Sequence, residues 1–267
     1  TEIYTLSLHD ALPISIQGMC EAEYFDFIKS GCADEESFLQ EYMCQPADDD
    51  AAFLTYDMIA SCEVSDPFAD ICDVANPSIK GPLYVGVDIG RKKDLTVIWV
   101  LELLGDTLWT RHVSCLQGMA KPEQEKVLYP IIEAPNVQRC CIDNTGLGIG
   151  WVDDAQARFG PRRVEGVTFT QRVKESLAYP GRGRFEDRTI RIPYDPKVRA
   201  DLRQVRKETT AAGNIRFTAE RTPDGHADRF WALALAIHAA GGPSGPIEFE
   251  STGTRRASAG LEKYLNG

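Results

Sequence analysis

The order of apolar and polar positions from residue 83 onward predicts a sheet that begins as an antiparallel meander. Apolar runs with β-branched and aromatic residues predict strands at 83–88, 95–103 and 107–115. Gly105-Asp106 supplies the hairpin turn between the second and third of these strands. The three strands are therefore expected to lie side by side.

The pattern then changes to alternating helices and strands. Pro122 opens a helix, a position that proline tolerates well, and its apolar residues recur at helical spacing: Val127, Leu128, Ile131 and Ile132. A strand at 138–143, a helix from about 150 to 159 and a strand at 164–169 follow. The order βββαβαβ predicts an α/β fold with a mixed sheet and helices packed on it. The first and fourth strands of this order are expected to be neighbours.

Three aspartates stand where regular elements begin or end. Asp88 ends the first strand, Asp143 ends the fourth, and Asp228 opens an alanine-rich helix. Hard divalent cations such as Mg²⁺ take oxygen ligands from one or a few carboxylates. Two such ions about 4 Å apart can stabilise both the attacking and the leaving oxygen of a phosphodiester displacement. The sequence therefore predicts a two-metal site formed by these carboxylates.

Two further polar residues lie close to these aspartates in sequence. Asp94 follows Asp88 by six positions, and it either approaches the metals or closes the turn between the first two strands. His226 precedes Asp228 by two positions, where it can orient water, contact phosphate or cap the helix. The residue spacing alone leaves these alternatives open.

The net charge of -11 hides an uneven distribution of charge. Residues 1–80 carry 17 acidic and two basic side chains, whereas residues 81–267 carry 23 and 27. The segment 158–207 holds 14 basic and six acidic side chains. Since binding of an anion depends on the field around its site, the second part of the chain is compatible with a polyphosphate ligand.

Five arginines of the basic segment are predicted to contact DNA. In a helix predicted at 196–207, Val198, Leu202 and Val205 form the apolar stripe. Arginines beside that stripe are expected to face outward and neutralise phosphates: Arg199, Arg203 and Arg206. Arg182 and Arg184 add basic groups from a loop predicted at 179–184. A solvated helix face is the alternative for any one of them, and no major-groove recognition motif accompanies them.

Eight cysteines and four histidines occur without a C-x-x-C pair. This spacing favours buried reduced thiols over a zinc site or a disulfide framework. No run of about 18 apolar residues and no signal peptide is present, so a cytosolic protein is expected.

Taken together, the three aspartate motifs resemble a known family. Val87-Asp88-Ile89-Gly90, Ile142-Asp143-Asn144 and His226-Ala227-Asp228 are similar to the ribonuclease H-like nuclease domain of phage terminase large subunits, and most of all to those of Mu-like phages and prophages. The resemblance covers roughly residues 20 to 240 and extends upstream to 38–46, which looks like the stretch joining the ATPase domain to the nuclease.

The resemblance implies a function and a set of partners. It implies two Mg²⁺ or Mn²⁺ ions bound by Asp88, Asp143 and Asp228, with Asp88 bridging them, and cutting of double-stranded DNA during genome packaging. Lys174 stands where this family often has a basic residue near the site. A portal protein and a small terminase subunit would be the partners, and the host cytoplasm the location.

The domain organisation follows from this resemblance together with local features of the sequence. Residues 1–15 fit nothing that follows and look like a translated sequencing adapter, so the chain is expected to be truncated at its N-terminus. Residues 16–80 are interpreted as an acidic remnant and linker from the end of the ATPase domain, 81–241 as the nuclease domain, and 242–267 as a flexible tail.

Two other classes of function remain as alternatives. Actin-like ATPases and resolvases share the ribonuclease H-like sheet, but a single copy that ends with Asp228 on a helix favours the nuclease. Gly146-Leu147-Gly148-Ile149-Gly150 resembles a dinucleotide loop, although its spacing departs from G-x-G-x-x-G and no ATPase phosphate-loop motif occurs. The last alternative is a non-catalytic prophage remnant that serves as a docking module.

Overall fold

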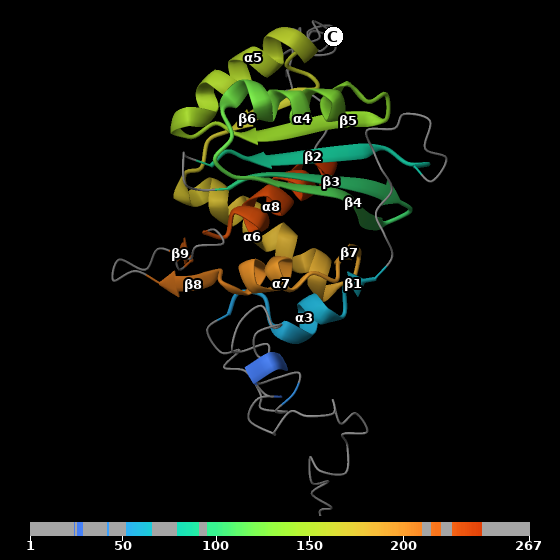
Figure 1. Cartoon of the computed structure of the whole chain (residues 1–267), viewed down its shortest axis with the longest axis vertical. Coiled ribbons are helices and arrows are strands. Elements are labelled where there is room, and N and C mark those ends of the chain that lie inside the picture. Colours follow the sequence, from blue (N-terminus) through green and yellow to red (C-terminus); the bar gives the residue numbers. More distant parts are fainter. Residues whose placement is uncertain are drawn as a thin grey trace, which may run out of the picture.

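The computed structural model describes residues 24, 26–28, 42, 52–65, 79–90, 95–209, 215–219 and 226–241. Within them a seven-stranded mixed sheet lies between two layers of helices (Figure 1). Its strand order is β1-β7-β4-β3-β2-β5-β6. The strands are β1 Glu63–Val64, β2 Leu83–Asp88, β3 Thr96–Leu104, β4 Thr107–Leu116, β5 Val137–Asp143, β6 Val164–Val167 and β7 Ile190–Pro193.

The helices divide between the two faces of the sheet, with α4 and α5 on one face and α6 and α8 on the other (Figure 1). Strands β8 and β9 form a separate antiparallel hairpin. The bounds are α3 Tyr56–Ala60, α4 Lys121–Glu133, η2 Gly146–Gly148, α5 Ile149–Phe159, α6 Gln171–Glu186, α7 Pro196–Arg203, β8 Arg206–Thr209, β9 Ile215–Thr218 and α8 Asp228–Gly241. No described helix combines the length and the hydropathy that a bilayer span requires.

The predicted βββαβαβ order is confirmed by β2, β3, β4, α4, β5, α5 and β6. Strand β2 pairs antiparallel with β3 and parallel with β5, as expected for the first and fourth strands of that order. Val87 is in register with Ile142. Asp88 and Asp143 therefore end neighbouring parallel strands at the same edge of the sheet.

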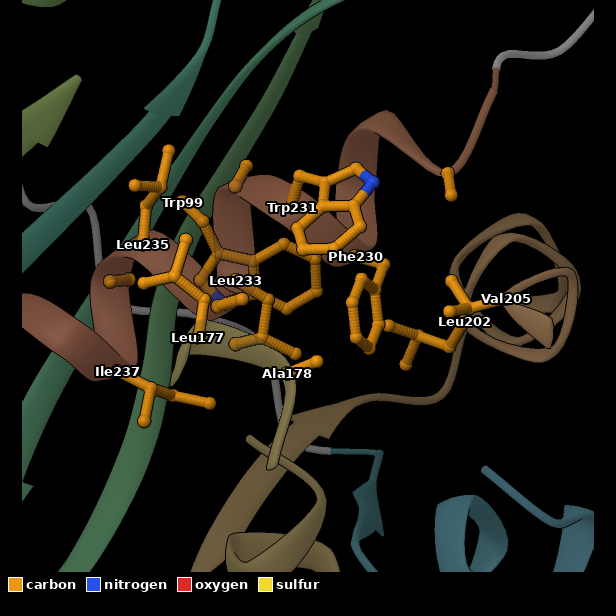
Figure 2. Close-up of a cluster of buried hydrophobic side chains, with 14 of the residues drawn as sticks. Trp99, Leu177, Ala178, Leu202, Val205, Phe230, Trp231, Leu233, Leu235 and Ile237 are labelled. Carbon is orange, nitrogen blue, oxygen red and sulfur yellow. The ribbon is translucent and has the colours of Figure 1, made fainter. Parts of the chain in front are cut away.

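Two apolar cores hold the layers together. Val85 and Val87 of β2 face α4 and α5, where they pack with Ile131 and Trp151. On the opposite face, Trp99 of β3 lies among side chains of α6 and α8, and the cluster continues to α7 (Figure 2). Burial of such side chains contributes about 1.5–3 kcal/mol each, so both faces of the sheet are firmly anchored.

Helix α8 lies unusually close to β2 because Gly86 has no side chain. A Cβ atom at Gly86 would lie 2.1 Å from the carbonyl oxygen of Ala232 and 2.3 Å from the backbone nitrogen of Ala236. The contact fixes α8 across the strand that ends at Asp88. Since Asp228 lies about one helical turn before Ala232, it is carried to the same edge of the sheet.

The expected start of the domain near residue 81 differs from the packing that the structure shows. Residues 52–65 belong to the same body, because β1 pairs in parallel with β7 and Phe53 is buried in the core. The Phe53 ring lies 4.9 Å from that of Phe217 in β9. The proposed 1–15 and 242–267 segments, and most of 16–80, lie outside the described residues.

Two local predictions were wrong. The expected loop at 179–184 lies inside α6, since Leu177, Ala178, Gly181 and Phe185 recur at helical spacing and are buried. Their burial outweighs the local cost of Pro180 in a helix. The helix predicted at 196–207 ends at Arg203, and the chain continues as β8.

Candidate metal centre

Three carboxylates meet at one edge of the sheet. Asp88, Asp143 and Asp228 are 8%, 7% and 8% exposed. Burial raises the pKa of Asp88 well above its ordinary value, and the negative charges of Asp228 and Asp143 raise it further. The structure thus brings together the three residues predicted to share a site, and the cost of their mutual repulsion is concentrated on Asp88.

Asp143 is held by the turn that follows β5. The backbone N–H of Thr145 donates to Asp143 Oδ1 at 2.9 Å, and the Thr145 hydroxyl accepts the N–H of Phe169 at 3.0 Å. Gly146 has a φ of 64°, and a Cβ atom at Gly148 would lie 1.8 Å from the Asp143 carbonyl oxygen. The glycines therefore serve this tight turn, which positions the carboxylate and explains the likeness to a dinucleotide loop.

Asp228 is positioned by its own turn and by α7. The His226 N–H donates to Asp228 Oδ2 at 3.3 Å, across Ala227, which is buried with a φ of 59°. Such a backbone conformation costs a non-glycine residue free energy and is found most often at functional sites. On the other side, Asp201 of α7 accepts the backbone N–H of Arg229 at 2.8 Å and so caps the start of α8.

Asp201 was missed by the sequence analysis. Burial raises its pKa to about 6, against the lowering effect of its hydrogen bond and ion pair with Arg229. Its position carried a signal, because Asp201 is buried on α7 together with the apolar residues Val198 and Leu202. A carboxylate on an apolar helix face needs a buried partner, and here Arg229 is that partner.

Lys174 lies beside the carboxylates, as the resemblance implied. Its ammonium nitrogen is 4.6 Å from the centre of the Trp231 ring and 5.5 Å from that of Phe169. Burial lowers the pKa of Lys174, while Asp88 and Asp143 oppose that shift. The half-buried ammonium group is thus held at the edge of an anionic site, where it could contact a phosphate bound in the same place.

A cleft of about 480 Å³ opens over this site. It is lined by Asp88, Asp228, His226, Lys174 and Trp231, and its other wall comes from the β8–β9 hairpin. That wall includes Arg216, Phe217 and Thr218. The sequence analysis missed Arg216, whose only signal was a basic residue in a short strand after Gly213-Asn214.

Two of the five arginines predicted to contact DNA do not face outward. Arg199 and Arg203 are buried, with exposures of 2% and 7%. Arg199 donates to both carboxylate oxygens of Glu63, at 2.9 and 2.7 Å, and to the hydroxyl of Tyr56 at 3.1 Å. The prediction failed because residues 52–65 cover the side of α7 that was expected to be solvated.

The other three arginines are placed differently from one another. Arg206 is exposed on β8, opposite Thr218 of the cleft wall. Arg182 donates to Glu186 at 2.7 Å and to the Phe53 carbonyl at 3.0 Å, whereas Arg184 donates to the Asp106 carbonyl at 2.9 Å. Along α6 they lie about 12–15 Å from Lys174, so the structure does not bring them to the cleft. Asp94 lies outside the described residues.

The charges of the site fit divalent cations. The ammonium group of Lys174 offsets only part of the upward shift in the pKa of Asp88, so negative charge is in excess around that carboxylate. Carboxylate oxygens are the ligands that Mg²⁺ and Mn²⁺ prefer. Buried charges are costly unless they are paired or coordinate a metal, so a bound divalent cation would stabilise this group of carboxylates.

The fold and its edge site define a class of protein. A mixed sheet with helices on both faces, in which two adjacent parallel strands and a helix N-terminus each contribute a carboxylate, is the ribonuclease H-like nuclease fold. Residues 85–240 match the family model of the terminase RNaseH-like domain, and the chain belongs to that family.

Individual relatives agree with this assignment. The chain is 24% identical over 239 residues to the terminase ATPase subunit of Escherichia phage P2, a match that covers 79% of this chain and 39% of the length of that relative. Among solved structures, the large terminase nuclease of thermophilic phage G20c with bound magnesium superposes with a TM-score of 0.58 and 21% identity. That match covers 72% of this chain and 98% of the other.

A second solved structure has the same fold. The nuclease domain of the large terminase of Thermus phage P74-26 superposes with a TM-score of 0.52 at 22% identity, covering 67% of this chain and 90% of the other. The predicted ribonuclease H-like fold is thereby confirmed.

Proposed function

We propose that this domain is a metal-dependent endonuclease that hydrolyses phosphodiester bonds of double-stranded DNA. The observation that carries the proposal is the burial of Asp88, Asp143 and Asp228 together beside a cleft, with the pKa of Asp88 raised by burial and by its two neighbours. A protein keeps such a costly group of carboxylates when a bound cation compensates it.

In this proposal Asp88, Asp143 and Asp228 hold two Mg²⁺ or Mn²⁺ ions. The ions would supply Lewis-acid polarisation of the scissile phosphate and an activated water. The Thr145 N–H fixes the orientation of Asp143, and Asp201 fixes the start of α8 below Asp228. Lys174 offers its ammonium group to a phosphate oxygen in the cleft, and His226 lines the same cleft.

The β8–β9 hairpin is proposed to hold the DNA. Arg216 lines the cleft, and Arg206 and Lys207 are exposed on the paired strand. Contacts of this kind neutralise phosphates and do not read base sequence. Arg182 and Arg184 stay candidates for DNA contact farther along α6, whereas Arg199 is excluded by its ion pair with Glu63.

The biological setting belongs to the same proposal. Relatives named as terminases suggest that the cutting occurs during genome packaging in the host cytoplasm, with a portal protein and a small terminase subunit as partners. The support for this setting is family membership and the phage P2 terminase subunit, of which the chain spans 39%.

The test is cleavage of supercoiled plasmid with Mg²⁺ or Mn²⁺. Wild type should nick and linearise the plasmid, while Asp88→Asn and Asp143→Asn should lose at least about 100-fold in rate, because the ions supply several kcal/mol of transition-state stabilisation. Asp153→Asn, an exposed aspartate of α5 on the other face of the sheet, is the matched control and should cleave as wild type does. If the folded wild-type protein does not cleave the plasmid in the presence of either Mg²⁺ or Mn²⁺, the result would instead support the non-catalytic docking module.

A further inference from the structure

A second cluster of potential ligands lies between β5, β6 and α8, and its cysteine is on the same strand as Asp143, two residues before it. Cys141 of β5 is in register with Glu165 of β6, and both lie under the C-terminal half of α8, where His238 projects toward them. The Cys141 sulfur, a Glu165 oxygen and a His238 nitrogen all lie within 4.8 Å of one another.

The geometry of the cluster is close to that of a four-coordinate metal site. Metal–ligand bonds of about 2.3 Å to sulfur and 2.0–2.2 Å to nitrogen and oxygen place tetrahedral ligand atoms roughly 3.4–3.6 Å apart. His238 Nε2 and Glu165 Oε1 are already 3.6 Å apart. The remaining pairs need to close by no more than about 1.3 Å, which a side-chain rotation can supply.

The surroundings also suit a bound metal. Arg139 forms an ion pair with Glu165 Oε2, which leaves Oε1 directed at His238. Hydrogen bonding to the second oxygen of a ligating carboxylate is a usual way to fix its orientation. Cys141 is fully buried, whereas the side chains of Glu165 and His238 are each 37% exposed. An ion could therefore enter from solvent, and a water could complete its coordination.

The ligand types select the kind of metal. Sulfur and imidazole nitrogen favour borderline cations such as Zn²⁺ and Co²⁺, and Mg²⁺ prefers oxygen ligands only. Cys141 would bind as a thiolate and release its proton to solvent. The all-oxygen aspartate site and this mixed site would thus take different ions.

We propose that Cys141, Glu165 and His238 bind one Zn²⁺-class divalent cation that ties α8 to β5 and β6. Helix α8 also carries Asp228 and strand β5 also carries Asp143, so occupancy of this site supports the spacing of these two aspartates. The spacing rules applied to the sequence missed it because its three ligands come from three separate elements. The inference stands independently of the proposed nuclease activity.

The test is titration of the metal-free, reduced protein with Co²⁺, followed by absorption. A thiolate bound to Co²⁺ gives a near-ultraviolet charge-transfer band that an all-oxygen site does not give. We expect one equivalent of Co²⁺ to produce the band in wild type and in Asp88→Asn, whose aspartate site is impaired. Addition of Zn²⁺ should then displace the Co²⁺ and remove the band. Failure of the nuclease proposal would leave this result unchanged.

Variants assign the band to the cluster. Cys141→Ser should abolish it, and His238→Ala, at a partly exposed position, should weaken Co²⁺ binding at least about tenfold. Cys140→Ser is the matched control, since Cys140 is equally buried on the opposite face of β5 and should keep the band. No band in a folded wild type, or a band that survives both Cys141→Ser and His238→Ala, would show that the cluster is only an ion-paired network around Glu165.

Discussion

Lys174 of α6 and Trp231 of α8 form a cation–π pair, with the ammonium nitrogen 4.6 Å from the ring centre. Trp231 lies three residues after Asp228, so both side chains are on the same face of α8. The ring holds a positive charge beside Asp88 and Asp143 without neutralising it. If the carboxylates hold the proposed metal ions, Lys174 competes with those ions for the carboxylates and can also contact a phosphate.

These two roles predict opposite effects for Lys174→Met. Removing the cation should tighten Mn²⁺ binding severalfold, because the carboxylates lose a competing positive charge. Cleavage at saturating Mn²⁺ should fall by at least about tenfold, because the charge on the transferring phosphate loses a partner. Calorimetric Mn²⁺ titration and plasmid cleavage measure the two effects. Lys126→Met, an exposed lysine of α4, should change neither, and a loss of both affinity and rate in Lys174→Met would contradict the model of competition.

The raised pKa of Asp88 predicts how the stability of the metal-free protein depends on pH. A carboxyl group whose pKa is higher in the folded state stabilises the fold below its unfolded pKa, and that contribution is lost as pH rises through the folded value. In EDTA, wild type should therefore lose stability as pH rises above 4, and the pKa of Asp201, about 6, adds a further loss near that pH. Asp88→Asn should be more stable than wild type at pH 7 and should show a weaker pH dependence. Urea unfolding across this pH range measures the free energy of unfolding of both proteins. An Asp88→Asn variant that is less stable than wild type at pH 7 would contradict the interpretation.

Metal ions should reverse this instability. At a Mg²⁺ concentration of about 100 times the dissociation constant, binding stabilises the folded state by about 2.7 kcal/mol. For a domain of this size that corresponds to roughly 5–10 °C in Tm. The shift should disappear in Asp88→Asn/Asp143→Asn and return to zero with EDTA. An equal shift in the double variant would place Mg²⁺ elsewhere.

The sequence predicted five of the seven strands of the sheet, because these strands are strongly apolar and the turns carry clear markers such as Gly105-Asp106. It did not predict β1 and β7, which are only two and four residues long. The edge location of Asp88 and Asp143 followed from strand order alone. The position of Asp228 depended on the resemblance, because the close contact of Gly86 with Ala232 is a tertiary feature without a local pattern.

The failures have a common physical origin. Arg199 was expected in solvent because its partners, Glu63 and Tyr56, lie more than 130 positions away in sequence. Burial of Leu177 and Phe185 likewise overrode the local preferences of Pro180 and Gly181. In both cases a long-range contact decided what local periodicity could not.

Gly86 predicts how tightly the site depends on the packing of α8. Gly86→Ala should destabilise the protein by about 1–3 kcal/mol or more, since its Cβ would meet backbone atoms that cannot rotate away. Cleavage should fall as well, because α8 carries Asp228. Gly183→Ala in α6 is the matched control: its Cβ meets nothing within 4 Å, and the gain in helix propensity should stabilise the protein by up to about 1 kcal/mol. Urea unfolding and plasmid cleavage of both variants test the contrast, and a neutral Gly86→Ala would disprove it.

The arginines of the hairpin and of α7 predict different kinds of loss. Arg216→Ala and Arg206→Ala should each reduce the dependence of DNA affinity on salt by about one counterion, with little change in stability, because both side chains are exposed. Arg199→Ala should instead cost about 3–5 kcal/mol of stability, because Glu63 would be left as a buried charge without its ion-pair partner.

Filter binding at several salt concentrations and urea unfolding separate the two effects. In Arg199→Ala, the fraction that remains folded should keep the wild-type salt dependence. If Arg199→Ala lowered that dependence while Arg216→Ala did not, DNA would follow α7 and the hairpin would lose its proposed role.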